Sequence, residues 1–428
     1  MLKTLVLVHL SILGSQLLSA QNQLSYLEKP KLSGIHIYQN AANKRCTIVA
    51  GSDELLPSPT LIYQLDSNAH IVAAKQIAPC GKNITSAATS NHNRTIIARS
   101  VLTSTGQLTA NLICLDSRLN IQWSSIVESN HIAFVNAVQI GPLGNTFVVG
   151  NGLTRPPSEN YSFLCKMDAH GEKAWELVDF PKGDTIAFWR LAVDDHDNAY
   201  AVGSMGNKGL LTKITASGDV EWQQSIFYRS ETRLSAITAS NGFLYVLGAE
   251  GGQGKVFLSK LTATGQMVWT TLLSSAYRFS PDHASIKTTE QGEIVLALYY
   301  VDPLINQRAW AAVRMDESGK VMQASSYQNN AHESFPRDLF LGKNAAMAGI
   351  GTLAVVGEPD KYPFFLQSTL PEVLGGQCCF TPFSTTQKSI NLELLPATLE
   401  FVNQVVINFV DFPLVTKDDA GTIRGLKK

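Results

Sequence analysis

The chain has 428 residues, of which 45% are hydrophobic and 16% are charged, and its formal net charge is −1. The balanced charge excludes a strong electrostatic attraction to nucleic acid or to an anionic membrane surface. The low charge content, together with 31 glycines and 17 prolines, excludes a disordered, fibrous or coiled-coil chain and indicates a large buried core with many turns.

The first twenty residues have the pattern of a secretory signal peptide. Lys3 precedes an apolar run from Leu5 to Leu13, and Ala20 stands just before a polar segment. The apolar run is too short to cross a bilayer as a helix, and a buried N-terminal helix is the alternative interpretation. We therefore predict that residues 1–20 are removed on export. The mature protein is then secreted, periplasmic or attached to the cell surface, with no transmembrane segment.

One sequence segment recurs along the chain. Equivalent positions in its copies lie 47 to 54 residues apart. Each copy is preceded by two short β-prone runs, of which TFVVGN from Thr146 and AYAVGS from Ala199 are clear examples. Four short strands in each period are typical of a propeller blade, with a series of sandwich domains as the alternative. We predict an all-β fold in which residues 24–376 form a β-propeller of seven four-stranded blades.

The strongest copies contain a turn glycine followed four residues later by a tryptophan. The glycine is expected in a tight turn between the third and fourth strands, where a positive φ is easily reached. The tryptophan is expected to pack between neighbouring blades. The glycines are Gly171, Gly218, Gly265 and Gly319, and the tryptophans are Trp123, Trp175, Trp222 and Trp269.

The order of these residues resembles two known repeat families. The repeat has a Val-x-Gly strand, then a strand that ends in the order hydrophobic-Lys-hydrophobic-Asp, then a glycine and a tryptophan. This order resembles the bacterial SBBP-type β-propeller repeat. The order is also similar to the tryptophan motif of quinoprotein-like propellers. The resemblance covers about residues 47–370, and Ala73 and Gln323 replace the tryptophan in weaker copies. It implies a propeller in a secreted or cell-envelope protein that binds other molecules.

Six cysteines remain after residue 20, and an even number permits disulfides in an exported protein. Cys46 and Cys80 flank the first predicted blade, so a bond between them would clamp the ring. Cys114 and Cys165 lie on equivalent strands, one residue out of register. They are therefore expected to face opposite sides of their sheets, and buried free thiols are one interpretation of this pair.

Residues 377–428 follow the last repeat and alternate apolar and polar residues in two places. This pattern predicts a C-terminal β-rich extension, which serves either as a surface-attachment module or as a structural cap on the ring. The adjacent Cys378 and Cys379 stand at its start, where a disulfide would staple the extension to the ring.

The sequence contains no recognisable catalytic, phosphate-binding or cofactor-binding motif. The acidic run from Asp194 to Asn198 lacks the ligand pattern of a calcium loop, so we predict a solvated turn and no metal site. Propellers bind at the axial mouth, where loops of several blades converge. Polar residues near the starts of the predicted innermost strands are Asn136, Arg190, Arg233, Asp282, His283, Arg337 and Asp338.

Three arginines in this set favour an anionic ligand, with solvated loop charges as the alternative. The sequence therefore favours an exported binding scaffold without a cofactor or catalytic residues, whose partner is a protein or a carbohydrate. The alternative is an enzyme, either a quinoprotein-like dehydrogenase or a lyase, with its active site in the axial pocket.

Overall fold

The computed structural model describes the chain in segments that cover most of the region between residues 23 and 425. The described ranges are 23–27, 33–39, 46–51, 60–66, 71–77, 84–90, 94–102, 108–128, 132–153, 160–179, 185–228, 231–251, 254–274, 278–302, 306–327, 332–341, 346–355, 361–369, 381–382, 386–389, 393–396, 408–411, 416–418 and 423–425. The predicted signal peptide, Cys80, Cys378 and Cys379 lie outside these residues.

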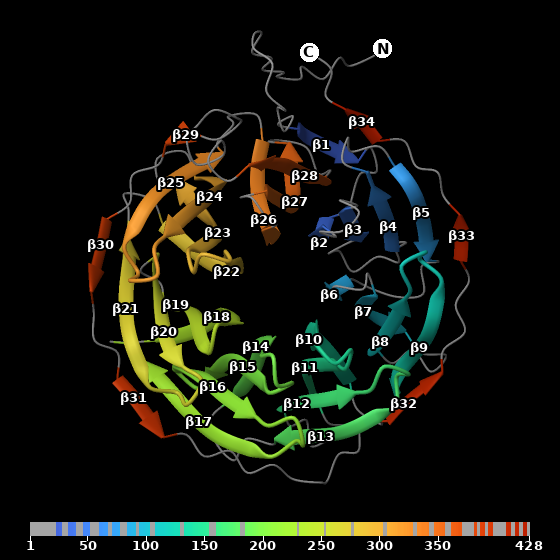
Figure 1. The fold of residues 1–428 in the computed structure, drawn as a ribbon, viewed down its shortest axis with the longest axis horizontal. Coiled ribbons are helices and arrows are strands. Elements are labelled where there is room, and N and C mark those ends of the chain that lie inside the picture. Colours follow the sequence, from blue (N-terminus) through green and yellow to red (C-terminus); the bar gives the residue numbers. More distant parts are fainter. Residues whose placement is uncertain are drawn as a thin grey trace.

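The described strands form seven antiparallel sheets arranged around one axis (Figure 1). Each sheet is one blade, and the blades follow one another in chain order. Six blades contain four consecutive strands, and the seventh contains three consecutive strands and the N-terminal β1. The predicted all-β propeller with four-stranded blades is therefore confirmed. No helix in the described part of the chain has the length and hydrophobicity that a membrane span requires.

The strands of each blade run from the axis outwards. The first blade contains β2 (Ser33–Gln39), β3 (Cys46–Gly51), β4 (Thr60–Leu65) and β5 (Ile71–Ile77), and the second contains β6 (Ile84–Thr89), β7 (Thr95–Leu102), β8 (Leu108–Leu115) and β9 (Ile121–Glu128). The third contains β10 (Ile132–Ile140), β11 (Thr146–Leu153), β12 (Asn160–Met167) and β13 (Lys173–Asp179), and the fourth contains β14 (Ile186–Val193), β15 (Ala199–Met205), β16 (Lys208–Ile214) and β17 (Val220–Phe227). The fifth contains β18 (Thr232–Ser240), β19 (Phe243–Glu250), β20 (Lys255–Thr262) and β21 (Met267–Ser274), and the sixth contains β22 (Arg278–Thr288), β23 (Ile294–Asp302), β24 (Gln307–Met315) and β25 (Val321–Tyr327). The seventh contains β26 (His332–Leu341), β27 (Ala346–Val355) and β28 (Lys361–Thr369), with β1 (Gln23–Leu27) as its outer strand.

The ring is closed by strand pairing between the two ends of the propeller. β1 pairs antiparallel with β28, so that Tyr26 lies opposite Phe364. The N-terminal strand thus completes the last blade, and the last blade contacts the first through β26, β27 and β2. This pairing satisfies backbone groups that an open ring would leave at its edge.

Short strands from the C-terminal segment pair with the outer edges of the blades. They are β29 (Thr381–Pro382) on β25, β30 (Thr386–Ser389) on β21, β31 (Glu393–Pro396) on β17, β32 (Asn408–Asp411) on β9, β33 (Thr416–Asp418) on β5 and β34 (Ile423–Gly425) on β1. They follow the ring in the direction opposite to the blades (Figure 1).

The hydrophobic core lies between neighbouring blades because each sheet has apolar residues on both faces. One cluster joins Phe147 and Leu164 of the third blade to Phe188 and Leu210 of the fourth. Such burial contributes about 25 cal/mol for each Å² of apolar surface removed from water. The low content of charged residues follows from this arrangement, since both faces of most strands are covered.

The repeated tryptophans join each blade to the next. The indole N–H groups of Trp123, Trp175, Trp222 and Trp269 donate to the main-chain oxygens of Ala169, Ala216, Ala263 and Glu317, over 3.0 to 3.2 Å. Each acceptor belongs to the turn between the third and fourth strands of the next blade. In one such turn Gly218 has a φ of +98°, and a Cβ atom there would lie 2.8 Å from Cγ of Trp175. Glycine is therefore required at this position both for the turn and for the approach of the indole.

Cys46 is a free thiol in the structure, and Cys80, its predicted disulfide partner, lies outside the described residues. Cys46 begins β3 and is buried in an apolar cluster with Ile37 and Ile48. Burial raises the pKa of the Cys46 thiol to about 12. Cys114 and Cys165 are also free and buried, and they enter the same cluster between the second and third blades from facing sheets.

Candidate functional site

The innermost strands of the propeller share a structural irregularity. Each strand has a shift in register with its neighbour a few residues after its start, for example between Phe188 and Arg190 and between Leu234 and Ala236. The same shift occurs in β2, β6, β10 and β26, and β22 has a longer irregularity between Ser280 and Ser285. A β-bulge of this kind places one extra residue in the strand and redirects its side chain. Neighbouring blades cover both faces of each sheet, so the extra residue is directed towards the axis.

The exposure of the residues at these bulges agrees with that direction. Ser235 is partly exposed between the buried Leu234 and Ala236. Trp189 is 38% exposed, although the preceding Phe188 is completely buried. The bulges therefore form an inner wall around the axis, and the side chains of this wall are the candidate functional site.

On one side of the inner wall, polar residues from four innermost strands make a connected cluster. His36 Nδ1 lies 2.6 Å from Asp338 Oδ2, and His36 Nε2 lies 3.1 Å from Thr89 Oγ1. Lys287 Nζ lies 3.6 Å from Asp338 Oδ1, and the Ser285 hydroxyl lies 3.5 Å from the same oxygen. The cluster joins β2, β6, β22 and β26.

The Asp338 carboxylate is the centre of this cluster. It also accepts hydrogen bonds from the main-chain N–H groups of Ile37 and Leu339, over 3.3 and 2.9 Å. Burial by itself raises the pKa of Asp338, but the charges of Lys287 and His36 and the hydrogen bonds together hold this pKa well below its ordinary value. Asp338 is therefore ionised at neutral pH and orients the imidazole of His36.

On the opposite side of the axis, β14 presents an aromatic and a cationic side chain. Figure 1 shows β14 across the axis from β2 and β26. Arg190 Nη1 donates to the main-chain oxygen of Trp189 over 2.9 Å, so the guanidinium is held at the indole-bearing residue. Asn136 of the neighbouring blade donates from Nδ2 to the main-chain oxygen of Phe188 over 2.6 Å. These contacts fix the β14 bulge in place.

All seven residues predicted for the axial mouth lie on innermost strands, but they do not form one site. Asp338 belongs to the polar cluster, whereas Asn136 and Arg190 lie on the side of Trp189. Arg233 is exposed and pairs locally with Glu231, with 2.7 Å between Nε and Oε1. Arg337 occupies the bulge of β26. The side chains of Asp282 and His283 on β22 lie outside the described residues.

Sequence reasoning missed His36, Lys287 and Trp189. Their positions carry no motif, and an apolar residue inside a strand is normally expected in the core. One signal could have found His36. It directly follows the bulge of β2, as Asp338 follows the bulge of β26, and the first and last blades of a closed ring are neighbours.

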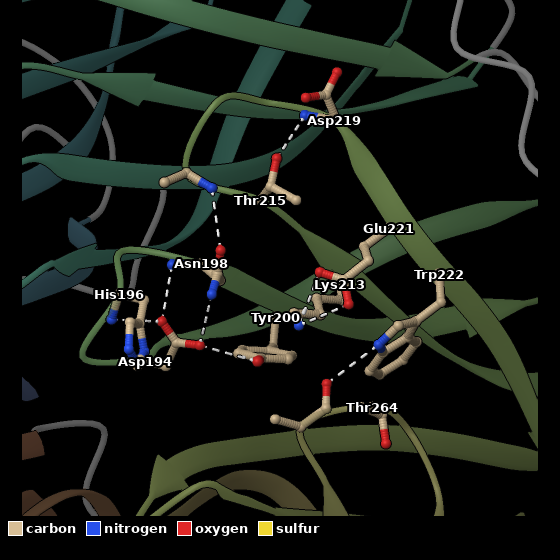
Figure 2. A network of polar contacts seen from close by, with 12 residues as sticks. Asp194, His196, Asn198, Tyr200, Lys213, Thr215, Asp219, Glu221, Trp222 and Thr264 are labelled. Carbon is tan, nitrogen blue, oxygen red and sulfur yellow. Dashed lines mark hydrogen bonds and ion pairs between the residues drawn. The ribbon is translucent and has the colours of Figure 1, made fainter.

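At the end of the ring opposite the mouth, the innermost strands lead into tight turns. Polar side chains in these turns make hydrogen bonds that hold the fold. In the turn from Asp194 to Asn198, the Asp194 carboxylate accepts from the main chain of His196 and Asn198, from Asn198 Nδ2 and from the Tyr200 hydroxyl (Figure 2). Burial by itself raises the pKa of Asp194, but these hydrogen bonds hold it below its ordinary value. Among the described residues, no group of three or more His, Cys, Asp or Glu side chains is placed to hold a metal ion.

The turns at this end also bond neighbouring blades to one another. Arg94 Nη1 donates to the main-chain oxygen of Gly144 over 2.5 Å, and Asn145 Nδ2 donates to Asp197 Oδ2 over 2.5 Å. Lys166 Nζ lies 3.4 Å from the same Asp197 oxygen, and Asp197 is completely buried. This end of the ring is therefore held together by polar contacts between blades.

Comparisons with known proteins add the following findings. No protein-family model and no curated protein matches the sequence. A prolyl oligopeptidase B from Galerina marginata is similar in structure, with 11% identity and a TM-score of 0.43 over 76% of this chain and 46% of that one. The chain thus spans less than half of that protein.

Two further solved structures match over almost their whole length. A protein of unknown function from Dyadobacter fermentans has 10% identity and a TM-score of 0.42, over 81% of this chain and 98% of that chain. A protein from Lactobacillus plantarum has 11% identity and a TM-score of 0.41, over 86% of this chain and 100% of that chain. Likenesses of this degree carry no argument about activity.

Proposed function

We propose that this chain is an exported propeller that binds a protein or carbohydrate partner at its axial mouth, at the end where the innermost strands begin. One observation carries the proposal, namely the exposed side chains that the bulges bring to the inner wall near the mouth. Side chains bond one blade to the next at both ends of the ring, as Asn145 does with Asp197 at the far end and Asn136 does with Phe188 near the mouth. Near the strand starts, the bulges direct side chains towards the axis.

The inner wall near the mouth carries exposed groups that the core does not use. Trp189 is 38% exposed, and the side chain of Lys287 is 36% exposed. An exposed indole forgoes about 2 kcal/mol or more of burial free energy, so its retention is better explained by a ligand than by stability. Arg190 adds positive charge to the wall, which favours a ligand with an anionic group.

Export is part of this proposal and rests on the pattern of residues 1–20. The N-terminal sequence of the protein recovered from the medium or the periplasm tests it directly. We expect the mature chain to begin just after Ala20. A recovered chain that retains Lys3 and the apolar run contradicts export by signal cleavage.

A second candidate function is an enzyme with its active site at the same mouth. The chain of hydrogen bonds from Asp338 through His36 to Thr89 specifically favours it, because a carboxylate that orients an imidazole is a common arrangement for a general base. Such a base would suit the proton removal of a lyase. Binding is the better-supported function, because Asp338 also accepts the main-chain N–H of Ile37 in the first blade and therefore has a structural role in joining the first and last blades.

The proposed function is tested with labelled mature protein on an array of extracellular proteins and oligosaccharides. We expect a bound partner to be lost when Arg190 and Arg233 are both changed to alanine. A matched control at the far end, Asp195→Ala, should bind like the wild type, because Asp195 is an exposed turn residue. Binding that fails only in the Asp195 variant contradicts the proposal. Turnover of a bound compound that disappears in His36→Gln would establish the enzyme instead.

A further inference from the structure

Trp189 has an unusual combination of position and exposure. It is an aromatic residue in the innermost strand of its blade, where Phe188 on one side and Leu191 on the other are buried. The bulge between Phe188 and Arg190 turns it out of the sheet. Its exposure therefore results from the backbone geometry and not from a loose strand, since Asn136 holds the main chain at Phe188 from the neighbouring blade.

The positions beside Trp189 on the ring are occupied by smaller residues. The corresponding bulge residues of the neighbouring blades are Asn136 and Ser235, and the residues that follow them are Ala137 and Ala236. The indole is thus the largest side chain at the bulges of these three blades.

A positive charge is held at the main chain of Trp189. The guanidinium of Arg190 donates to the main-chain oxygen of Trp189, which keeps it beside the aromatic residue. A guanidinium binds a carboxylate or a sulfate in a planar, bidentate manner and is charged at every physiological pH. An apolar flat surface and a fixed cation therefore lie next to each other on one strand.

The surroundings of Trp189 separate a carbohydrate from a protein partner. A protein interface surrounds its aromatic anchor with further apolar contacts. The other strongly exposed apolar side chains among the described residues lie away from the innermost strands, on β5, β11, β21, β25 and one turn: Val72, Leu143, Leu153, Val268 and Met322. Among the residues that the structure describes, Trp189 is therefore an aromatic surface without another strongly exposed large apolar side chain on the innermost strands. A pyranose ring matches it, because its C–H face is apolar while hydroxyl groups occupy its rim.

We propose that Trp189 and Arg190 bind an acidic carbohydrate, with a pyranose ring stacked on the indole and its carboxylate or sulfate paired with the guanidinium. This inference deepens the proposed function and rests on it. Asn136 and Ser235 lie on the neighbouring blades, where they can take part in hydrogen bonds to the sugar hydroxyls. The charge on Arg190 selects acidic over neutral sugars.

The test uses the full mature protein and three acidic probes, which are tetragalacturonate, sialyllactose and a heparin-derived tetrasaccharide. Each is paired with an uncharged counterpart, and binding is measured by calorimetry and by tryptophan fluorescence. We expect at least one acidic probe to bind about tenfold more tightly than its neutral form. Trp189→Ala should weaken this binding by about tenfold or more, whereas Trp189→Phe should retain most of it. Arg190→Ala should abolish the preference for the acidic form.

A control variant and a second measurement keep the outcomes distinct. Met322→Ala removes an exposed apolar side chain of β25, the fourth strand of its blade, and should bind like the wild type. Unfolding temperatures of all variants identify any loss of the fold. The inference is overturned if no probe binds, or if binding survives Trp189→Ala. The inference is also overturned if Trp189→Ala abolishes binding to an extracellular protein but to none of the carbohydrate probes. In that case the proposed function still holds. The proposed function is overturned together with this inference only if the change of both Arg190 and Arg233 to alanine also leaves every interaction unchanged.

Discussion

Replacing Asp338 by asparagine tests whether the polar cluster closes the ring. Both carboxylate oxygens accept a main-chain N–H, since Ile37 donates to Oδ2 and Leu339 donates to Oδ1. Whichever way the amide of the variant is turned, its NH₂ group faces one of these donors. The variant also loses the charge-assisted bond to His36. Hydrogen bonds to charged groups contribute about 1.5–3 kcal/mol each, so we expect a loss of about 3 kcal/mol in the free energy of unfolding.

The pH dependence gives the same prediction a second, independent readout. The pKa of Asp338 is lower in the folded protein than in the unfolded chain, where it is about 3.9. The ionised carboxylate therefore contributes its full stabilisation above pH 4, and this contribution is lost as the pH falls through the folded pKa. Asparagine does not titrate. The difference in stability between wild type and variant should thus be largest near pH 7 and should shrink below pH 4.

Urea unfolding followed by tryptophan fluorescence measures this difference at each pH. Asp195→Asn is the matched control, because it makes the same chemical change at an exposed turn residue. It should alter stability by no more than about 0.5 kcal/mol. The reasoning is refuted if Asp338→Asn behaves like the control at pH 7, or if its effect is the same at pH 7 and pH 3.

Three further changes test the contacts between blades and the state of the thiols. Trp175→Phe removes an indole N–H that bonds to the next blade, so thermal unfolding should show a loss of about 1 kcal/mol. Gly141→Ala places a Cβ atom 2.2 Å from Asp197 Oδ1, so it should cost about 2 kcal/mol or more. Gly242→Ala, with open space around its Cβ and a φ of +77°, should cost only about 1 kcal/mol, and equal losses at both glycines would argue against the close contact. Cys46, with a pKa raised by burial to about 12, should resist alkylation at pH 8 until the protein is unfolded, and peptide mass spectrometry that finds rapid native labelling would show that it is accessible.

Much of the fold could be predicted because the repeated features are local. Alternating apolar residues and turn glycines such as Gly218 act within a few residues of the chain. Their recurrence about every fifty residues indicates four-stranded blades stacked around an axis. The position of Trp175 after Gly171 likewise pointed to packing between blades. The flanking positions of Cys46 and Cys80 in sequence did not reveal that the Cys46 thiol faces an apolar interface.

The candidate site depended on contacts that no local pattern contains. His36 and Asp338 are 302 positions apart, and only ring closure through β1 and β28 makes their blades neighbours. Trp189 reads as a core residue in sequence, but the bulge of β14 turns it towards the axis. The sequence by itself therefore determined the blades, their turns and the tryptophans that join them, since these arise from short-range periodicity. The tertiary structure alone decided which side chains meet across the closure and which face the axis, because both depend on strand register and on how the first and last blades come together.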